Sequence, residues 1–218
     1  MSISPTHAAR PGAALLLPRT FYDRSVHDVA RDLLGTILVR MSTDRRGRSV
    51  RLAGRVVEVE AYDGPRDLAC HASKGRTERT EVMFGEAGYA YIYLVYGMHS
   101  CLNVVTGPVD YPAAVLIRAL EPIEGIEGMN PGRARISQIG SGPGRLTRAL
   151  WIDRSLNRTD LCAPGPLSIE AGTPVSDREV LRGPRIGVEY AGPWAGKPWR
   201  LGVRGSAALS RPFGATAL

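Results

Sequence analysis

Hydrophobic and polar residues alternate along the stretch Arg55–Tyr62, and this alternation predicts a half-buried β-strand. Side chains at every second position of a strand share one face. Glu58, Glu60 and Tyr62 should therefore point to one side, and the intervening apolar residues to the other. The apolar side has a core to pack against, so two carboxylates and a phenol face either solvent or a functional site.

A second alternating run, residues 89–96, carries four tyrosines. Gly97 breaks this run, and residues 99–106 predict a returning strand, so Tyr96 should sit near the tip of a β-hairpin. Tyr89 and Tyr91 are expected in the core or at the rim. Together with His71 in the preceding polar loop, these aromatic residues and the carboxylates predict a pocket that stacks on a flat ring and activates water.

Other patterns are shorter. Residues 25–35 predict an amphipathic helix that ends at Gly35, and a second helix is expected over residues 147–152. Further strands are predicted at 36–41, 112–122, 182–188 and 199–204, with a long charged loop at 65–88. We expect an α+β fold, a single compact domain around a curved, mainly antiparallel β-sheet with a protruding β-hairpin.

Arg118 interrupts the strongly apolar strand predicted at 112–122. A charge in such a run is costly unless it is paired. Arg118 therefore predicts a carboxylate partner, for which Glu58, Glu60 and Glu121 are the candidates. A buried ion pair without any chemistry would satisfy this pattern equally well.

The 218 residues suit one domain of substantial core, and no linker or internal repeat divides them. We expect a flexible N-terminal arm over residues 1–18, the folded domain over 19–210, and a C-terminal tail over 211–218. The longest apolar run, residues 13–18, is much shorter than the ~20 residues that span a bilayer. A signal peptide is not expected either, because the run lacks the flanking features of one.

The three cysteines are scattered and form no metal-binding spacing, so we expect a reducing compartment, no metal and no cofactor. The adjacent pair Cys70 and His71 predicts a buried thiol beside a pocket histidine rather than a metal site. The formal net charge of +7 favours an anionic partner. Charge alone leaves nucleic-acid binding open.

Two segments carry candidates for phosphate contacts. The loop at 65–88 contains Lys74, Arg76 and Arg79 among Ser and Thr, a mixture that contacts phosphates at nucleic-acid interfaces. The Gly-rich turn at 140–144 precedes a predicted helix and could hold a phosphate, with Ser141, Gly142 and Arg145 as candidates. A solvated loop and an ordinary loop-to-helix turn are the alternatives. His99, beside the hairpin tip, is a further candidate for backbone contact.

At this point several motifs, in order, resemble the alkyladenine (3-methyladenine) DNA glycosylase family, as in a bacterial member. The resemblance covers roughly Phe21 to Ser206 and rests on the segments 57–62, 83–84, 91–98, 118–122, 141–143, 184–187, 191–194 and 197–200, with His71 and Asn103. Departures at Pro193, Leu201-Gly202 and Ala207 leave the pocket motifs intact.

The resemblance implies roles for individual residues. Glu60 matches the general base that deprotonates water, and Arg118 matches the residue that holds Glu60 and this water. Tyr62, His71 and Tyr93 match the walls around a flipped base, Asn103 a gatekeeper against guanine, and the Ile186 carbonyl a further water contact. Tyr96, with Met98 beside it, matches the wedge that enters the gap left in the duplex. Glu58 matches no catalytic position.

The resemblance thus implies a DNA repair enzyme that hydrolyses the N-glycosidic bond of alkylated or deaminated purines in double-stranded DNA. The only lysines, Lys74 and Lys197, lie outside the predicted pocket strands, so we expect a monofunctional enzyme that leaves an abasic site. We also expect a cytoplasmic monomer without membrane contact. A non-catalytic duplex DNA-binding module and a hydrolase of free nucleosides are the rival hypotheses.

Overall fold

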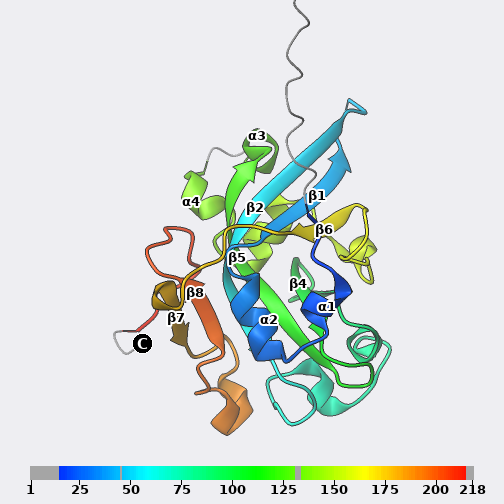
Figure 1. Cartoon of the computed structure of the whole chain (residues 1–218), viewed down its shortest axis with the longest axis vertical. Coiled ribbons are helices and arrows are strands. Elements are labelled where there is room, and N and C mark those ends of the chain that lie inside the picture. Colours follow the sequence, from blue (N-terminus) through cyan, green and yellow to red (C-terminus); the bar gives the residue numbers. More distant parts are fainter. Residues whose placement is uncertain (1–14, 45, 131–133, 215–218) are drawn as a thin grey trace, which may run out of the picture.

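A long central strand, β2, organises the sheet of this protein, as seen in a computed structural model that describes residues 15–44, 46–130 and 134–214 (Figure 1). The strands are β1 (Ile37–Thr43), β2 (Ser49–Tyr62), β3 (Ala90–Val95), β4 (His99–Thr106), β5 (Ala113–Glu124), β6 (Leu167–Glu170), β7 (Val180–Gly183) and β8 (Arg200–Val203). They pair antiparallel throughout in the order β3-β4-β5-β2-β1-β6, with β8 joining β2 to β7. The predicted α+β domain around a mainly antiparallel sheet is confirmed.

The helices are short. They are α1 (Arg19–Tyr22), α2 (Val26–Leu33), α3 (Ile126–Met129), α4 (Ile136–Ile139) and α5 (Pro143–Ala149), with 3₁₀ helices η1 (His71–Lys74), η2 (Glu81–Phe84), η3 (Arg154–Leu156), η4 (Asp177–Glu179) and η5 (Glu189–Trp194). In α2, Ser25 caps the N-terminus by accepting a hydrogen bond from the Asp28 amide, and its apolar residues are buried, as the amphipathic pattern predicts.

Two sequence predictions placed element boundaries wrongly. The helix predicted at 147–152 begins earlier, as α5, because Pro143 occupies its first turn, where a missing N–H costs no hydrogen bond. The strand predicted at 182–188 ends at Gly183, and residues 184–188 form a loop instead. This loop turns out to line the site.

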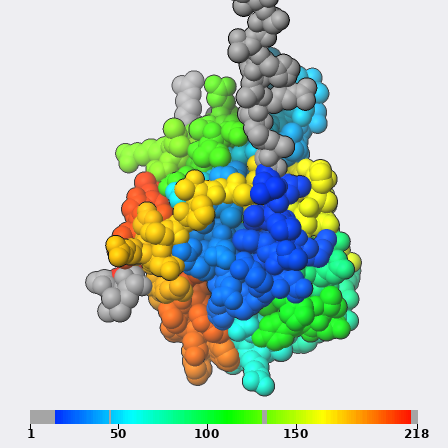
Figure 2. All heavy atoms as spheres, in the orientation of Figure 1, coloured from blue at the N-terminus to red at the C-terminus, as the bar shows by residue number. Residues whose placement is uncertain are grey.

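The strands have two differently used faces. One face of the sheet packs against α2 and forms the main core, which includes Ile92, Val104 and Val115. On this side of the molecule lie α1, α2 and the yellow-orange segment that begins at β6 (Figure 2). The alternate residues Tyr91, Val105 and Ala114 belong to a smaller apolar cluster with η1 and η2. The sheet therefore separates a structural core from a second face with its own small core.

A β-bulge in β2 sets the orientation of the acidic residues. The register with β5 shifts on both sides of Glu58, so that Val56 and Val57 both enter the main core. From Glu58 onward the alternation is regular. Past the end of its pairing with β1, β2 pairs with β8 at Glu58–Glu60. The acidic residues thus lie in the middle of the sheet.

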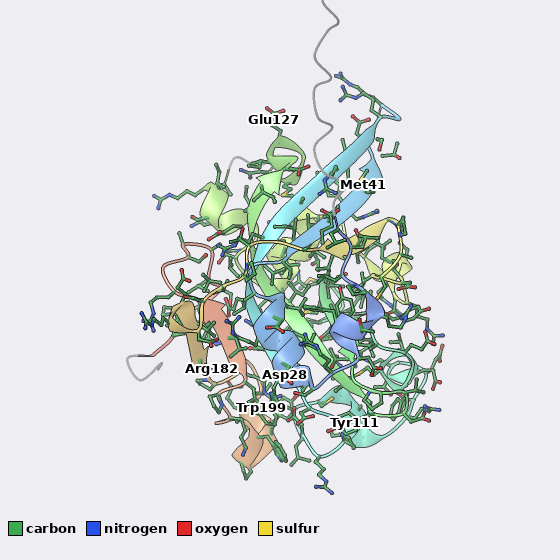
Figure 3. All side chains as sticks on the ribbon, in the orientation of Figure 1. Asp28, Met41, Tyr111, Glu127, Arg182 and Trp199 are labelled. Atoms are coloured by element: carbon green, nitrogen blue, oxygen red, sulfur yellow. The ribbon has the colours of Figure 1, made fainter. Side chains whose placement is uncertain are left out.

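The two predicted terminal segments are only partly described. Residues 1–14 and 215–218 lie outside the described residues. Within the rest, the Leu17 amide donates to the Ile169 carbonyl of β6, and Arg200 of β8 donates to the carbonyls of Arg211 and Pro212. Near the N-terminal end of α2, the ring centroids of His27 and Trp199 are 4.7 Å apart. Figure 3 labels Trp199 and the neighbouring helix residue Asp28.

Candidate active site

Glu60 of β2 is fully buried, and three groups hold its carboxylate. The Ile186 amide donates to Oε1 at 2.8 Å, and Arg118 Nη1 lies 3.3 Å from the same oxygen. The Tyr62 hydroxyl donates to Oε2 at 2.8 Å. The resemblance matched the Ile186 carbonyl to a water contact, whereas the contact made here is from its N–H; the carbonyl's role stays a prediction.

Arg118 of β5 has the carboxylate partners that its apolar surroundings required. Its Nε donates to Glu58 Oε1 at 3.2 Å, and its Nη1 faces Glu60. Glu121, the third candidate, contacts Arg55 and Ser206 instead. Burial disfavours the Arg118 charge, but the two carboxylates outweigh it and raise the pKa of the guanidinium.

The surroundings of Glu60 also shift its own titration. Burial raises the pKa of the Glu60 carboxyl above its usual value, while Arg118, the Ile186 amide and the Tyr62 hydroxyl partly offset this. A carboxylate with a raised pKa is a stronger proton acceptor than an exposed one. This is the property that a general base working near neutral pH needs.

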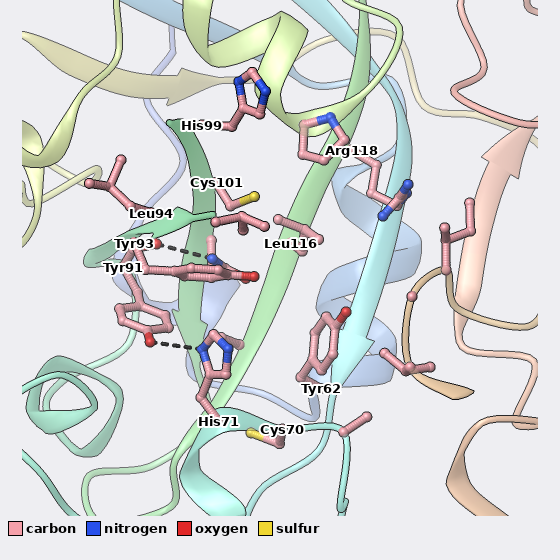
Figure 4. Close-up of a pocket in the computed structure, with 18 of the residues that line it drawn as sticks. Tyr62, Cys70, His71, Tyr91, Tyr93, Leu94, His99, Cys101, Leu116 and Arg118 are labelled. Carbon is pink, nitrogen blue, oxygen red and sulfur yellow. Dashed lines mark hydrogen bonds between the residues drawn. The ribbon is translucent and has the colours of Figure 1, made fainter. Parts of the chain in front are cut away.

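A cavity of about 560 Å³ opens beside this carboxylate, a size that suits a small aromatic ligand. Three groups that contact Glu60 also line this cavity, namely Tyr62, Arg118 and Ile186. Tyr62 stands on one side, with His71 and Tyr93 across the opening (Figure 4). The His71 and Tyr93 rings meet edge to face at 4.4 Å. The predicted aromatic walls are therefore brought together.

His71 is held in its neutral form. Burial, with Arg79 and Lys74 nearby, lowers the pKa of its imidazole to about 4. Its Nδ1 lies 2.9 Å from the Tyr91 hydroxyl, a contact drawn in Figure 4. At neutral pH the His71 imidazole itself therefore carries no charge that would repel a cationic ring.

Two cavity residues were missed or misplaced by the sequence reasoning. Tyr91, expected in the core or at the rim, is buried and also lines the cavity. Its carbonyl accepts a hydrogen bond from the Asn103 side chain at 3.1 Å, which fixes the predicted gatekeeper. Arg79, considered only as a phosphate contact, lies 5.2 Å from the Tyr93 ring and lines the cavity. Alternation places Tyr91 on the same face as Tyr93 and so could have identified it, whereas no spacing pointed to Arg79.

The β3–β4 hairpin carries the predicted wedge. Tyr96 occupies its turn with a positive φ of 51° and is 88% exposed, while Met98 is 74% exposed. Tyr96 and His99 line the cavity mouth. The hairpin therefore presents apolar side chains to solvent at the edge of the cavity.

Of the predicted phosphate contacts, His99 and Arg79 line the cavity, whereas the others do not. Lys74 ends η1, and Arg76 is paired with Asp110 and Glu81. Ser141 donates to the Leu209 carbonyl, Gly142 precedes α5, and Arg145 is exposed. Their neighbours Pro143 and Gly144 line the cavity instead. The phosphate roles stay predictions.

A buried ion pair that the sequence reasoning did not identify holds the loop that carries Ile186. Arg185 pairs with Asp67 through both terminal nitrogens, and both side chains are fully buried. Arg185 Nη1 also donates to the Ala61 carbonyl of β2 at 2.9 Å. This pair fixes the Ile186 amide against Glu60.

Across the described ranges, no group of three or more His, Cys, Asp or Glu residues is placed to hold a metal ion. Within the same ranges, no helix is long and apolar enough to cross a membrane.

Comparison with known proteins identifies the family of this chain. A family model described as methylpurine-DNA glycosylase (MPG) matches residues 20–207. Three relatives bear the name "Putative 3-methyladenine DNA glycosylase". The one from Myxococcus xanthus is 53% identical over 89% of this chain and 93% of its own. Those from Methanocella arvoryzae and Legionella pneumophila are 52% and 46% identical over 90% and 89% of this chain, and over 96% and 98% of their own.

Matches of this extent define the class of protein, a DNA glycosylase. The chain belongs to the methylpurine-DNA glycosylase family. The resemblance found from the sequence motifs is thereby confirmed.

Proposed function

We propose that this protein removes alkylated purines, 3-methyladenine among them, from duplex DNA by hydrolysing the N-glycosidic bond, and that Glu60 activates the water. One observation carries the proposal: a fully buried carboxylate, held by Arg118 and Ile186, lies directly behind the wall of an aromatic cavity. The relatives' names agree with this substrate class. A base inside a duplex is out of reach, so the nucleotide must flip into the cavity.

The contacts of Glu60 suggest where the water binds. Oε2 accepts a hydrogen bond from Tyr62, and a carboxylate oxygen can accept two. A water donating to Oε2 gives its proton to Glu60 as its oxygen attacks C1′ of the deoxyribose. The C1′–N bond then breaks, and its electron pair leaves with the purine. A cationic alkylated purine becomes neutral in this step and is therefore a good leaving group.

The cavity walls favour such a base. Electron-rich rings attract a cation by about 0.5–2 kcal/mol per contact, and Tyr62 and Tyr93 supply two of them. His71 is neutral because its pKa is lowered. The Asn103 side chain, anchored on the Tyr91 carbonyl, is placed to discriminate among purines. We infer that charge and shape together select the damaged base.

The lysine positions support a monofunctional reaction. Lys197 lies against the Trp194 ring at 5.7 Å, and Lys74 is exposed at the end of η1. Neither lines the cavity, whereas a strand-cleaving glycosylase uses an amine nucleophile there. The product should be an intact strand with an abasic site.

The test is base release from duplex oligonucleotides that carry an alkylated purine, hypoxanthine or ethenoadenine. We expect wild type to release the alkylated purine and to leave the strand intact until alkali treatment. Cleavage without alkali would contradict the monofunctional reaction. Tight duplex binding with no release would favour the non-catalytic binding module, and release from free nucleosides at a comparable rate would favour the nucleoside hydrolase.

Tyr96→Ala should slow base release from duplex DNA by roughly 5- to 150-fold, because stacking an aromatic ring on a base contributes about 1–3 kcal/mol. The exposed ring at the hairpin turn is proposed to fill the gap left by the flipped nucleotide. Single-turnover excision from a lesion in duplex DNA and in the single strand measures the effect. The loss should be much smaller on the single strand, where no stack needs refilling.

The matched control for this wedge is Ile123→Ala, an exposed apolar residue near the far end of β5. This substitution should leave both rates unchanged. Equal losses in the two variants, or an equal loss of Tyr96→Ala on single and double strands, would remove Tyr96 as the wedge.

A further inference from the structure

Glu58 lies beside Glu60 on the same face of β2 and is also fully buried, yet the proposed reaction does not use it. Its Oε1 accepts hydrogen bonds from Arg118 Nε at 3.2 Å, Arg200 Nη1 at 3.1 Å and the Ser210 hydroxyl at 2.8 Å. Its Oε2 accepts a hydrogen bond from the Ser210 amide at 2.5 Å. Two donors to this carboxylate therefore come from one serine, which lies beyond the family match ending at residue 207.

The same serine also contacts the guanidinium of Arg118. Arg118 Nη2 donates to Ser210 Oγ at 3.3 Å, Nε donates to Glu58, and Nη1 faces Glu60 Oε1 at 3.3 Å. A guanidinium is a rigid plane with donors in fixed directions. Fixing Nε and Nη2 therefore also fixes the direction of Nη1. The Ser210 hydroxyl helps to decide whether Arg118 points at Glu60.

The chain around Ser210 is anchored on β8. Arg200 donates to the carbonyls of Arg211 at 3.2 Å and Pro212 at 3.0 Å, and the Phe213 ring lies 3.8 Å from its guanidinium carbon. Arg200 also donates to the Pro184 carbonyl at 3.0 Å, close to the Ile186 amide that binds Glu60. A Cβ at Gly202 would approach the Phe213 ring to 2.6 Å, so the ring packs directly on the strand.

We propose that Ser210 is a positioning residue for base excision: the C-terminal segment 209–214 completes the hydrogen bonding of Glu58 and so holds Arg118 against Glu60. The inference rests on the proposed role of Glu60 as general base. Ser210 itself is not expected to touch DNA or the reacting atoms. Its effect reaches the reaction through Arg118, which stabilises the ionised form of Glu60.

The decisive variant is Ser210→Ala, which removes the hydroxyl while keeping the backbone amide. We expect its single-turnover excision rate to fall roughly tenfold, the scale of losing a hydrogen bond to charged groups. Its affinity for lesion-bearing duplex should be unchanged, since Ser210 does not line the cavity. Ser210→Thr retains a hydroxyl and should recover most of the rate.

A second readout follows the protonation of Glu60. A less well placed Arg118 stabilises the carboxylate less, so the acidic limb of the pH–rate profile should move to higher pH in Ser210→Ala. Titration of the ¹³C-labelled Glu60 carboxyl by NMR should show the same upward shift without DNA. The titratable or charged groups that influence or contact Glu60 are Glu58, Tyr62, Tyr93, Cys101, Arg118 and Arg185, and both serine variants leave all six in place.

Ser206→Ala is the matched control. Ser206 lies in the same terminal stretch and donates to a carboxylate, Glu121 Oε1, at 2.5 Å. The Ser206→Ala substitution should lower neither the excision rate nor the affinity for lesion-bearing duplex. If Ser210→Ala behaves like Ser206→Ala, or loses rate and thermal stability with no shift of Glu60 titration, the positioning role is wrong. Failure of wild type to release any base would instead overturn the proposed function, and the NMR titration would still decide whether Ser210 acts on Glu60.

Discussion

We expect Glu60→Gln to release the damaged base roughly 10²–10⁴-fold more slowly than wild type, the usual contribution of a general base. Glutamine keeps the size of the side chain and can still accept the Ile186 amide, but it takes no proton from water. Arg118 retains Glu58 as a partner, so the fold should persist. Single-turnover excision and binding to lesion-bearing duplex, measured together, should show lost turnover with retained affinity.

The pH dependence follows from the sign of the Glu60 shift. The base must be ionised, and burial raises its pKa above the ordinary value of 4.5. The wild-type excision rate should therefore fall as the pH decreases. This fall should begin at a higher pH than it would if the general base were an exposed glutamate. The residual excision rate of Glu60→Gln should not show this fall at low pH.

Glu170→Gln is the control for this variant, because Glu170 is another buried carboxylate that is paired with an arginine, Arg51 at 2.8 Å. It lies in β6, at the opposite edge of the sheet from the hairpin. Its excision rate should equal that of wild type. Equal rates for Glu60→Gln and wild type would remove Glu60 as the base.

The second large effect concerns stability. Asp67→Ala should lower the free energy of unfolding by about 3–5 kcal/mol, since it leaves the Arg185 charge buried without its partner. Arg185 would keep only the Ala61 and Trp194 carbonyls as acceptors, and its Nε already lacks a hydrogen-bond partner among the described residues. Excision should fall as well, as Arg185 precedes the amide that holds Glu60. Urea denaturation followed by circular dichroism measures the change.

Asp110→Ala provides the comparison for this ion pair. Asp110 pairs with Arg76 at 2.5 Å, but its side chain is 74% exposed. Exposed pairs contribute about 0–1 kcal/mol, so this variant should unfold almost as wild type does. A similar small change in Asp67→Ala would mean that Arg185 finds solvent or another acceptor in the variant, and would contradict the structural role given to the pair.

Local sequence patterns were sufficient to predict much of the sheet. Alternation located β2, β3 and β4, and it assigned Glu58, Glu60 and Tyr62 to one face, because the side-chain period of a strand is a local property. The charge of Arg118 in an apolar run required a carboxylate, and two of the three predicted candidates, Glu58 and Glu60, supply one. Boundaries failed at α5, where Pro143 begins the helix before the apolar pattern does, and at residues 184–188, where Pro184 has no N–H to donate to a strand and Gly187 has a positive φ of 76°.

The sequence by itself determined the candidate residues for the chemistry: the acidic strand, the tyrosine hairpin, the buried arginine and the ordered motifs of the family. Only the tertiary structure decided how they meet. Sheet register aligns Tyr91, Asn103, Leu116 and Glu60 across four strands, and such pairing depends on contacts between distant segments. The Asp67–Arg185 pair and the Ser210 contacts with Glu58 join residues 118 and 152 positions apart. No periodicity records such contacts, because they arise when the chain folds back on itself.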